Sequence, residues 1–360
     1  MKLKNIAIAF LGALLFATCS KKDDEKEYTA EESKAVVRST MDNFYNCLQN
    51  LNDGGFANFF HELLFKEAVR DQNGETQSWG EFLGEKFDKQ NFAEGLTEGD
   101  RFNYHRMKGT YTWNKNTELW EKIANNENVT FIFPATKGAT NNGKLVIDQY
   151  EDTETTYGND KVYLPTAAHL YATIDNTKVF EVTVKNVTFE KKTNFTMPLS
   201  AYISIYTNPF TTTIQWNRQN PENFVFDFAF SSPQGCTTGL HADIKLTTSD
   251  YGNISSLEKA IDKIAFTATQ GELRIVGNID VKSLEEKGND RKLRVEEINT
   301  YAKAVLMKGN SKIADVKYEE ENDKGVIYFI FSDGSREKAE KYVSDFEDRV
   351  TKIFKRFDRK

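Results

Sequence analysis

Apolar side chains between residues 29 and 94 recur at gaps of three and four, which is the period of an α-helix. Thr29, followed three residues later by Glu32, has the pattern of a capping box and predicts that the first helix begins there. The segment 52–55, Asn-Asp-Gly-Gly, predicts its end, because glycine tolerates the left-handed backbone of a helix stop. The apolar stripe of this helix contains Val37, Met41, Phe44, Leu48 and Leu51. Two shorter stripes follow, Phe56, Phe59, Phe60, Leu63 and Leu64, then Trp79, Phe82 and Leu83.

From about Phe102 the apolar period changes from helical to two. Phenylalanine occupies every second position from Phe224 to Phe230, with Asp227 and Ser231 among the alternating residues, so this run predicts a strand with one apolar face. Other alternating runs lie at 129–133, 210–216 and 240–246. Short turn-forming clusters separate them and leave too little chain for crossover helices, which indicates antiparallel pairing.

The last hundred residues mix the two periods. Val295, Ile298, Ala302 and Val305 fit a helix, residues 273–279 and 326–331 fit strands, and a long amphipathic helix is expected over 339–357. The predicted fold is therefore α+β. N-terminal helices pack on a large antiparallel sheet, as a sandwich or half-barrel, and a mixed C-terminal segment ends in a long helix.

The first 27 residues have the layout of an export signal. Lys2 and Lys4 precede an apolar run, Ile6 to Ala17, that is too short to span a membrane, and Cys19 follows it directly. This order resembles a bacterial lipoprotein signal, which implies diacylation of Cys19 and cleavage before it. Lys22-Asp23-Asp24 resembles the signal that sends some Bacteroidetes lipoproteins to the cell surface, although a plain hydrophilic spacer is the alternative. The resemblance implies a lipid-anchored protein of the outer membrane, on its periplasmic face or at the cell surface.

These patterns divide the chain into five segments: a signal peptide (1–18), a lipidated tether (19–28), a helical segment (29–94), an antiparallel β region (95–250) and an α+β C-terminal region (251–360). The last two form either one domain or two. The formal charge of the chain is −7, and removing Lys2 and Lys4 with the signal leaves −9. An acidic surface argues against a nucleic-acid partner, which requires basic side chains opposite the phosphates.

Cys47 and Cys236 remain after Cys19 is assigned to the lipid. An oxidising compartment would permit them to pair. Cys47 lies on the apolar stripe of a predicted helix and Cys236 in a glycine-containing loop, and two separate cysteines is the favoured interpretation.

The sequence contains no complete motif of a catalytic or metal-binding site. His61-Glu62 begins like a zinc-protease motif, but residue 65 is Phe where the second histidine is needed. Cys236 lies between glycines at the end of a predicted strand, a position that some nucleophilic cysteines occupy, yet turn formation explains the glycines more simply. The acids Glu151, Asp152 and Glu154 are typical of a loop surface. We therefore predict no catalytic residue, no metal site and no cofactor.

The remaining signal is the abundance of aromatic residues, which make up 13% of the chain. Most belong to an expected core. A bent sheet with a phenylalanine-lined face would instead hold an apolar ligand, and Trp79, Trp113, Trp120 and Trp216 with nearby tyrosines would form a sugar-stacking surface. The functional hypothesis is non-enzymatic binding of a lipid-like ligand, a glycan or a protein partner. The alternatives are an exported hydrolase of polymers and a purely structural envelope protein.

Overall fold

One large open sheet dominates the fold. The computed structural model describes residues 26–70, 74–94, 97–98, 101–125, 127–157, 160–192, 195–250, 257–288, 291–344 and 346–357. Among these, sixteen strands pair in the order β20-β19-β18-β17-β16-β15-β14-β13-β12-β11-β10-β9-β8-β7-β5-β6. The strands are β5 (Gly109–Asn114), β6 (Leu119–Ile123), β7 (Val129–Phe133), β8 (Gly143–Tyr157), β9 (Asp160–Ile174), β10 (Thr177–Lys192), β11 (Phe195–Thr207), β12 (Phe210–Asn220), β13 (Asn223–Ser231), β14 (Thr237–Leu246), β15 (Ile261–Gln270), β16 (Leu273–Asp280), β17 (Ala302–Lys308), β18 (Ser311–Glu321), β19 (Lys324–Ile330) and β20 (Arg336–Lys338).

Helices occur mainly in the N-terminal and C-terminal parts of the described chain, which confirms the predicted α+β class. They are α2 (Ala30–Asp53), α3 (Gly55–Phe60), the π-helical turn η1 (His61–Phe65), α4 (Trp79–Lys89), α5 (Tyr104–Met107), α6 (Leu257–Ala260), α7 (Val281–Gly288), α8 (Val295–Tyr301), the 3-10 turn η3 (Ala339–Tyr342), α9 (Phe346–Phe354) and the 3-10 turn η4 (Lys355–Phe357).

Almost every neighbouring pair in the large sheet whose register is known is antiparallel, as predicted, and the exception lies near one end. β5 pairs parallel with β7, from Gly109 opposite Val129 to Thr112 opposite Ile132. The intervening strand β6 turns back along β5 and supplies the crossover that a parallel pair requires.

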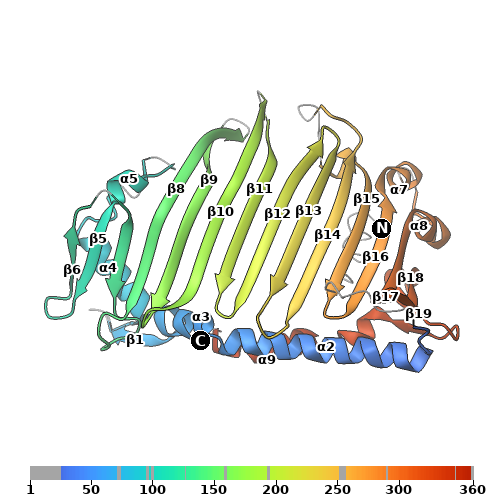
Figure 1. Ribbon diagram of the computed structural model, residues 1–360, viewed down its shortest axis with the longest axis horizontal. Coiled ribbons are helices and arrows are strands. Elements are labelled where there is room, and N and C mark those ends of the chain that lie inside the picture. Colours follow the sequence, from blue (N-terminus) through green and yellow to red (C-terminus); the bar gives the residue numbers. More distant parts are fainter. Residues whose placement is uncertain are drawn as a thin grey trace. The chain divides into compact units, whose positions relative to one another are not determined.

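The chain divides into two compact units. Unit 1 contains Met1–Leu48 and Thr213–Val350, and unit 2 contains Gln49–Thr212 and Thr351–Lys360. In unit 1, α2 runs across the lower ends of the strands in the view of Figure 1, and its apolar stripe shares one core with side chains of the sheet. This core includes Val37, Met41 and Phe44 from the helix and Phe266, Ile275, Leu306 and Val316 from the strands, all buried.

The core of unit 2 is strongly aromatic. Trp79 and Phe82 of α4 pack on Tyr111, Trp113 and Trp120 of β5 and β6, and their rings meet mostly edge to face at centroid separations of 5 to 6 Å. Offset and edge-to-face contacts of this kind stabilise beyond the apolar area that they bury. The predicted third stripe is therefore a true core helix.

The predicted start of the first helix is confirmed. The Glu32 backbone N–H donates to Thr29 Oγ1 at 3.2 Å, and the Thr29 N–H donates to Glu32 Oε2 at 2.9 Å. The predicted stop is also correct, since α2 ends at Asp53, but for a different reason. Gly54 has φ −68° and is not left-handed. A side chain there would collide with the carbonyl of Asn208 and with the Pro209 ring.

Two predictions of helix were wrong. Between the second and third stripes the chain forms a small hairpin, β1 (Glu67–Arg70) with β2 (Thr76–Ser78). The helix expected through Ala302 and Val305 stops at Tyr301, where β17 begins and pairs with β16. The terminal helix is also shorter than expected, because η3, α9 and η4 are separate pieces.

Candidate functional site

The residues of the predicted signal lie outside the described part of the chain. Cys19, Lys22, Asp23 and Asp24 all precede Lys26, the first residue that the structure describes. Their proposed roles therefore rest on the sequence.

Cys47 and Cys236 form a disulfide within unit 1, with their Cα atoms 5.7 Å apart. The interpretation as two separate cysteines was wrong, because the turn that carries Cys236 between β13 and β14 lies against α2. A disulfide sulfur cannot act as a nucleophile, so Cys236 is unavailable for the thiolate chemistry considered for it.

The tryptophans do not form a sugar-stacking surface. Trp79, Trp113 and Trp120 are at most 6% exposed inside the core of unit 2. Trp216 stacks on Phe224 in unit 1, with ring centroids 4.8 Å apart. Trp79, Trp113 and Trp120 are therefore core packing residues, whereas Trp216 is half-buried and lies in the other unit.

The histidines are separated along the fold. His61 packs its ring against Phe357 in unit 2. His241 lies on β14, and its Nδ1 is 2.7 Å from Asp227 across the strand pair. His169 of β9 lies between Asp148, at 2.6 Å, and Glu181, at 3.3 Å. The described residues contain no group of three or more His, Cys, Asp or Glu arranged to hold a metal ion.

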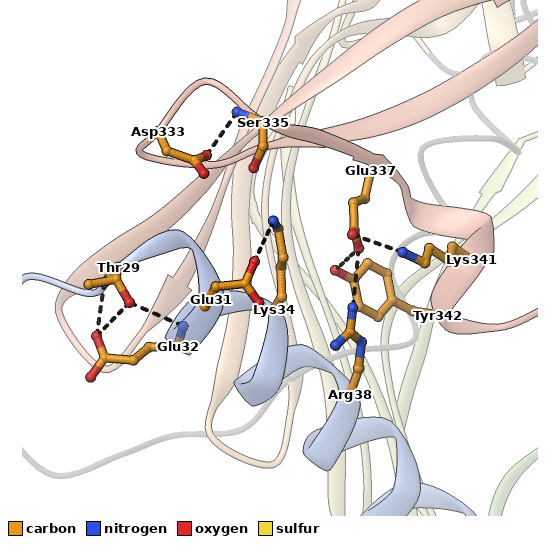
Figure 2. A network of polar contacts seen from close by, with 10 residues as sticks. All are labelled: Thr29, Glu31, Glu32, Lys34, Arg38, Asp333, Ser335, Glu337, Lys341 and Tyr342. Carbon is orange, nitrogen blue, oxygen red and sulfur yellow. Dashed lines mark hydrogen bonds and ion pairs between the residues drawn. The ribbon is translucent and has the colours of Figure 1, made fainter.

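A polar network joins the start of α2 to β20 and η3 in unit 1 (Figure 2). Glu337 accepts a hydrogen bond from the Tyr342 hydroxyl at 2.6 Å and pairs with Lys341 at 2.8 Å and Arg38 at 3.8 Å. Burial opposes ionisation of Glu337, but these partners outweigh it and lower its pKa. Burial and the Glu337 carboxylate together raise the pKa of Tyr342. Glu337, Lys341 and Arg38 each have an oppositely charged partner, so these contacts connect α2 to β20 and η3 and stabilise the fold.

A candidate binding site is a pocket of about 320 Å³ in unit 2. Its walls come from β4 (Arg101–Phe102), α5, β8 and β9. Aromatic rings form one side, because Phe102 meets Tyr150 edge to face at 4.9 Å between ring centroids and Tyr104 lies 6.4 Å from Tyr150. The other lining residues are polar: Arg101, Asn103, His105, Glu151, Asp152 and Thr166.

An ion pair between a buried carboxylate and an exposed guanidinium lies on the polar side of this pocket. The Asp152 side chain is only 2% exposed, whereas that of Arg101 is 53% exposed. Arg101 Nε and Nη2 lie 3.0 and 2.9 Å from Asp152 Oδ1, and the guanidinium also covers the Tyr163 ring at 5.4 Å. Burial, and next the Asp152 charge, raise the pKa of Tyr150, so its hydroxyl keeps its proton and remains a hydrogen-bond donor.

The fold brings these groups together from distant parts of the sequence. Asn103 caps α5 by accepting from the Arg106 N–H at 3.2 Å, which fixes the segment carrying Phe102 and Tyr104. Tyr104 donates to the Ile147 carbonyl on β8 at 3.3 Å. Of the acidic residues considered in the sequence, Asp152 lies on strand β8 and not in a loop, and its side chain is buried. Arg101 was not identified from the sequence, because 51 residues separate it from Asp152.

Comparison with known proteins found no matching family model, no similar curated protein and no similar solved structure. Within the described residues, no helix has both the length and the apolar character needed to cross a membrane.

Proposed function

We propose that this chain is an acyl-anchored envelope lipoprotein whose body binds a glycan, with the unit 2 pocket as the binding site. The anchor is the lipidated Cys19 expected from the signal segment. The observation that carries the binding proposal is the pocket itself, which is lined by aromatic rings and by the ion pair of the buried Asp152 carboxylate with Arg101.

The disulfide supports export. Disulfides persist in oxidising compartments such as the periplasm and the cell surface and are rare in the cytosol. The Cys47–Cys236 bond therefore agrees with a chain that leaves the cytoplasm behind a lipoprotein signal.

The chemistry of the pocket favours a hydroxyl-rich ligand over a lipid. Ligand sites generally enclose 300–1,000 Å³, and this one is at the small end. Arg101, Asn103 and Tyr150 offer donors, and Glu151 offers an acceptor, beside rings that can cover an apolar sugar face. A long acyl chain would displace water from these polar groups and offer them no hydrogen bond in exchange, which costs free energy.

The decisive experiment is native mass spectrometry of the mature lipoprotein in detergent with soluble oligosaccharides from bacterial envelope polymers. We expect a mass increment that disappears on denaturation. Tyr150→Phe removes a donor and keeps the ring, and should weaken binding roughly 3- to 10-fold, the effect of one hydrogen bond. Tyr202→Phe, on β11 of the same unit beside Lys185, is the matched control and should bind normally.

Other outcomes discriminate among the alternatives. Binding that is equal in wild type and Tyr150→Phe would move the site away from this pocket. No increment with any oligosaccharide would contradict glycan binding. Shortened oligosaccharides that accumulate with time would instead favour the exported hydrolase.

A further inference from the structure

The N-terminal segment joins unit 1 at a well-defined point. The Lys26 backbone N–H donates to Ser311 Oγ at 2.8 Å, and the Ser332 hydroxyl donates to the Tyr28 carbonyl at 3.3 Å. The Tyr28 ring packs on the core of unit 1, with Lys26 Nζ 4.6 Å and Lys308 Nζ 5.7 Å from its centroid. From Lys26 onward, therefore, the chain belongs to the body.

The start of α2 lies at the same end of unit 1 as these contacts of Lys26 and Tyr28. Figure 2 shows Thr29 and Glu31 close to the turn that carries Asp333 and Ser335, between β19 and β20. Lys34 is 2.9 Å from Glu31, and its ammonium lies 5.4 Å from the centre of the Phe331 ring. The helix start, this turn and the β17–β18 turn at 309–310 thus form one surface, which we call the junction end.

Chain length limits how far the junction end can be from the lipid. Lys26 is seven residues after Cys19, and seven residues span at most about 25 Å. Strand β18 leaves the junction end at Ser311 and reaches Glu321, about 33 Å away at the usual rise per residue. The turn at 322–323 is therefore farther from the junction than the anchor can reach.

Resting on the proposed lipidation of Cys19, we propose that the junction end of unit 1 is apposed to the headgroups of the membrane, with β18 rising away from the bilayer. The cations at this end are neutralised by neighbours: Lys26 by Glu32, Lys308 by Glu272 and Lys312 by Asp315. The anchor, and not a basic patch, therefore holds this surface in place. An exported chain of net charge −9 also avoids laying its faces along an anionic leaflet.

Paired nitroxide labels test this orientation on the intact lipoprotein. Cys19 is acylated and the other two cysteines are paired, so an introduced cysteine is the one free thiol. Lys312→Cys places the label at the junction end, and Lys324→Cys places it at the far end of β18, about 30 Å away. Both substitutions remove one exposed lysine. The protein is reconstituted into phosphatidylethanolamine–phosphatidylglycerol vesicles that contain a nickel-chelating lipid, and nitroxide relaxation is measured.

We expect relaxation at residue 312 to be enhanced several-fold more than at residue 324. Inserting a Gly-Ser segment after Glu25 should reduce the enhancement at 312, and an unchanged value would overturn the tether as its cause. Equal enhancement at both positions, with lipid confirmed on Cys19 by mass, would overturn the orientation alone. Absence of lipid on Cys19 would overturn both the anchor and the apposition.

Discussion

The histidines of the sheet have carboxylate neighbours that favour the imidazolium. For His169, burial alone would lower the pKa, but the hydrogen bonds and charges of Asp148 and Glu181 outweigh it, and the net shift is upward. For His241, the Asp227 hydrogen bond is the largest cause of a raised pKa. A raised folded-state pKa contributes stability that is complete below the unfolded value of about 6.5 and disappears as pH rises through the folded value.

Asp148→Asn should bring the pKa of His169 down toward its ordinary value. It should also lower the free energy of unfolding more at about pH 6 than at about pH 9, by about 1 kcal/mol or less, because the pair is partly solvated. The chain has four histidines, so imidazole NMR signals can resolve them individually.

Asp227→Asn is the matched control. It should move the signal of His241 and leave that of His169 unchanged, since the two pairs lie in different units. A His169 titration that is the same in wild type and Asp148→Asn would show that Asp148 does not stabilise the imidazolium.

Among the secondary-structure elements, those that depend on interactions between residues close in sequence could be predicted from the sequence pattern. The Phe224–Phe230 alternation became β13, with Phe226 opposite Ala242 and Phe228 opposite Leu240 in β14. The capping box of α2 could also be predicted, because its partners are three residues apart. In contrast, the apolar positions 295, 298, 302 and 305 are compatible with one continuous helix and also with a short helix followed by a strand. The second structure forms because residues from Ala302 onward pair with β16.

The candidate site could not be predicted in the same way. Arg101 and Asp152 meet only because α5 and the segment before it pack beside β8, and no sequence spacing encodes that contact. The four tryptophans were predicted as ligand contacts, yet three of them are buried in the core of unit 2, and the smaller rings of Phe102, Tyr104 and Tyr150 line the pocket. The disulfide joins residues 189 positions apart, so it too required the fold.

The disulfide couples the longest helix of the described chain to the turn between β13 and β14. Replacing both Cys47 and Cys236 by alanine should lower the free energy of unfolding of unit 1 by about 2–5 kcal/mol, because the unfolded chain regains the entropy of a long open loop. Urea unfolding followed in unit 1 measures the change. The imidazole NMR signal of His241, which lies in unit 1, reports on that unit.

Addition of a reductant provides the control for this experiment. It should shift the wild-type midpoint to that of the double variant and leave the variant unchanged. A wild-type midpoint that does not respond to reductant would contradict a stabilising role for the bond.

For the whole molecule, the proposed anchor (residues 19–25) and the folded body (from Lys26 onward) differ in sequence character. The body buries its apolar residues in two cores, one around α2 and one around α4, and each is completed by side chains from its own unit. Residues 19–25 contribute only Cys19 for the lipid and a run of charged side chains. Under the proposed function, location in the envelope would depend on this segment alone, and changes in it should leave the folded body intact.

Replacing Asp23 and Asp24 by alanine tests whether that segment directs the body to the cell surface. If the Lys22-Asp23-Asp24 signal acts, protease added to intact cells should digest the wild-type body and spare the variant, which becomes accessible once the outer membrane is permeabilised. Asp23→Glu with Asp24→Glu keeps both negative charges and should remain digestible if charge is what the signal requires. Cys19→Ser should abolish palmitate labelling and membrane association, which separates loss of the anchor from loss of surface export. A wild-type body that is protected in intact cells and digested after permeabilisation would place it on the periplasmic face and leave residues 22–24 as a hydrophilic spacer.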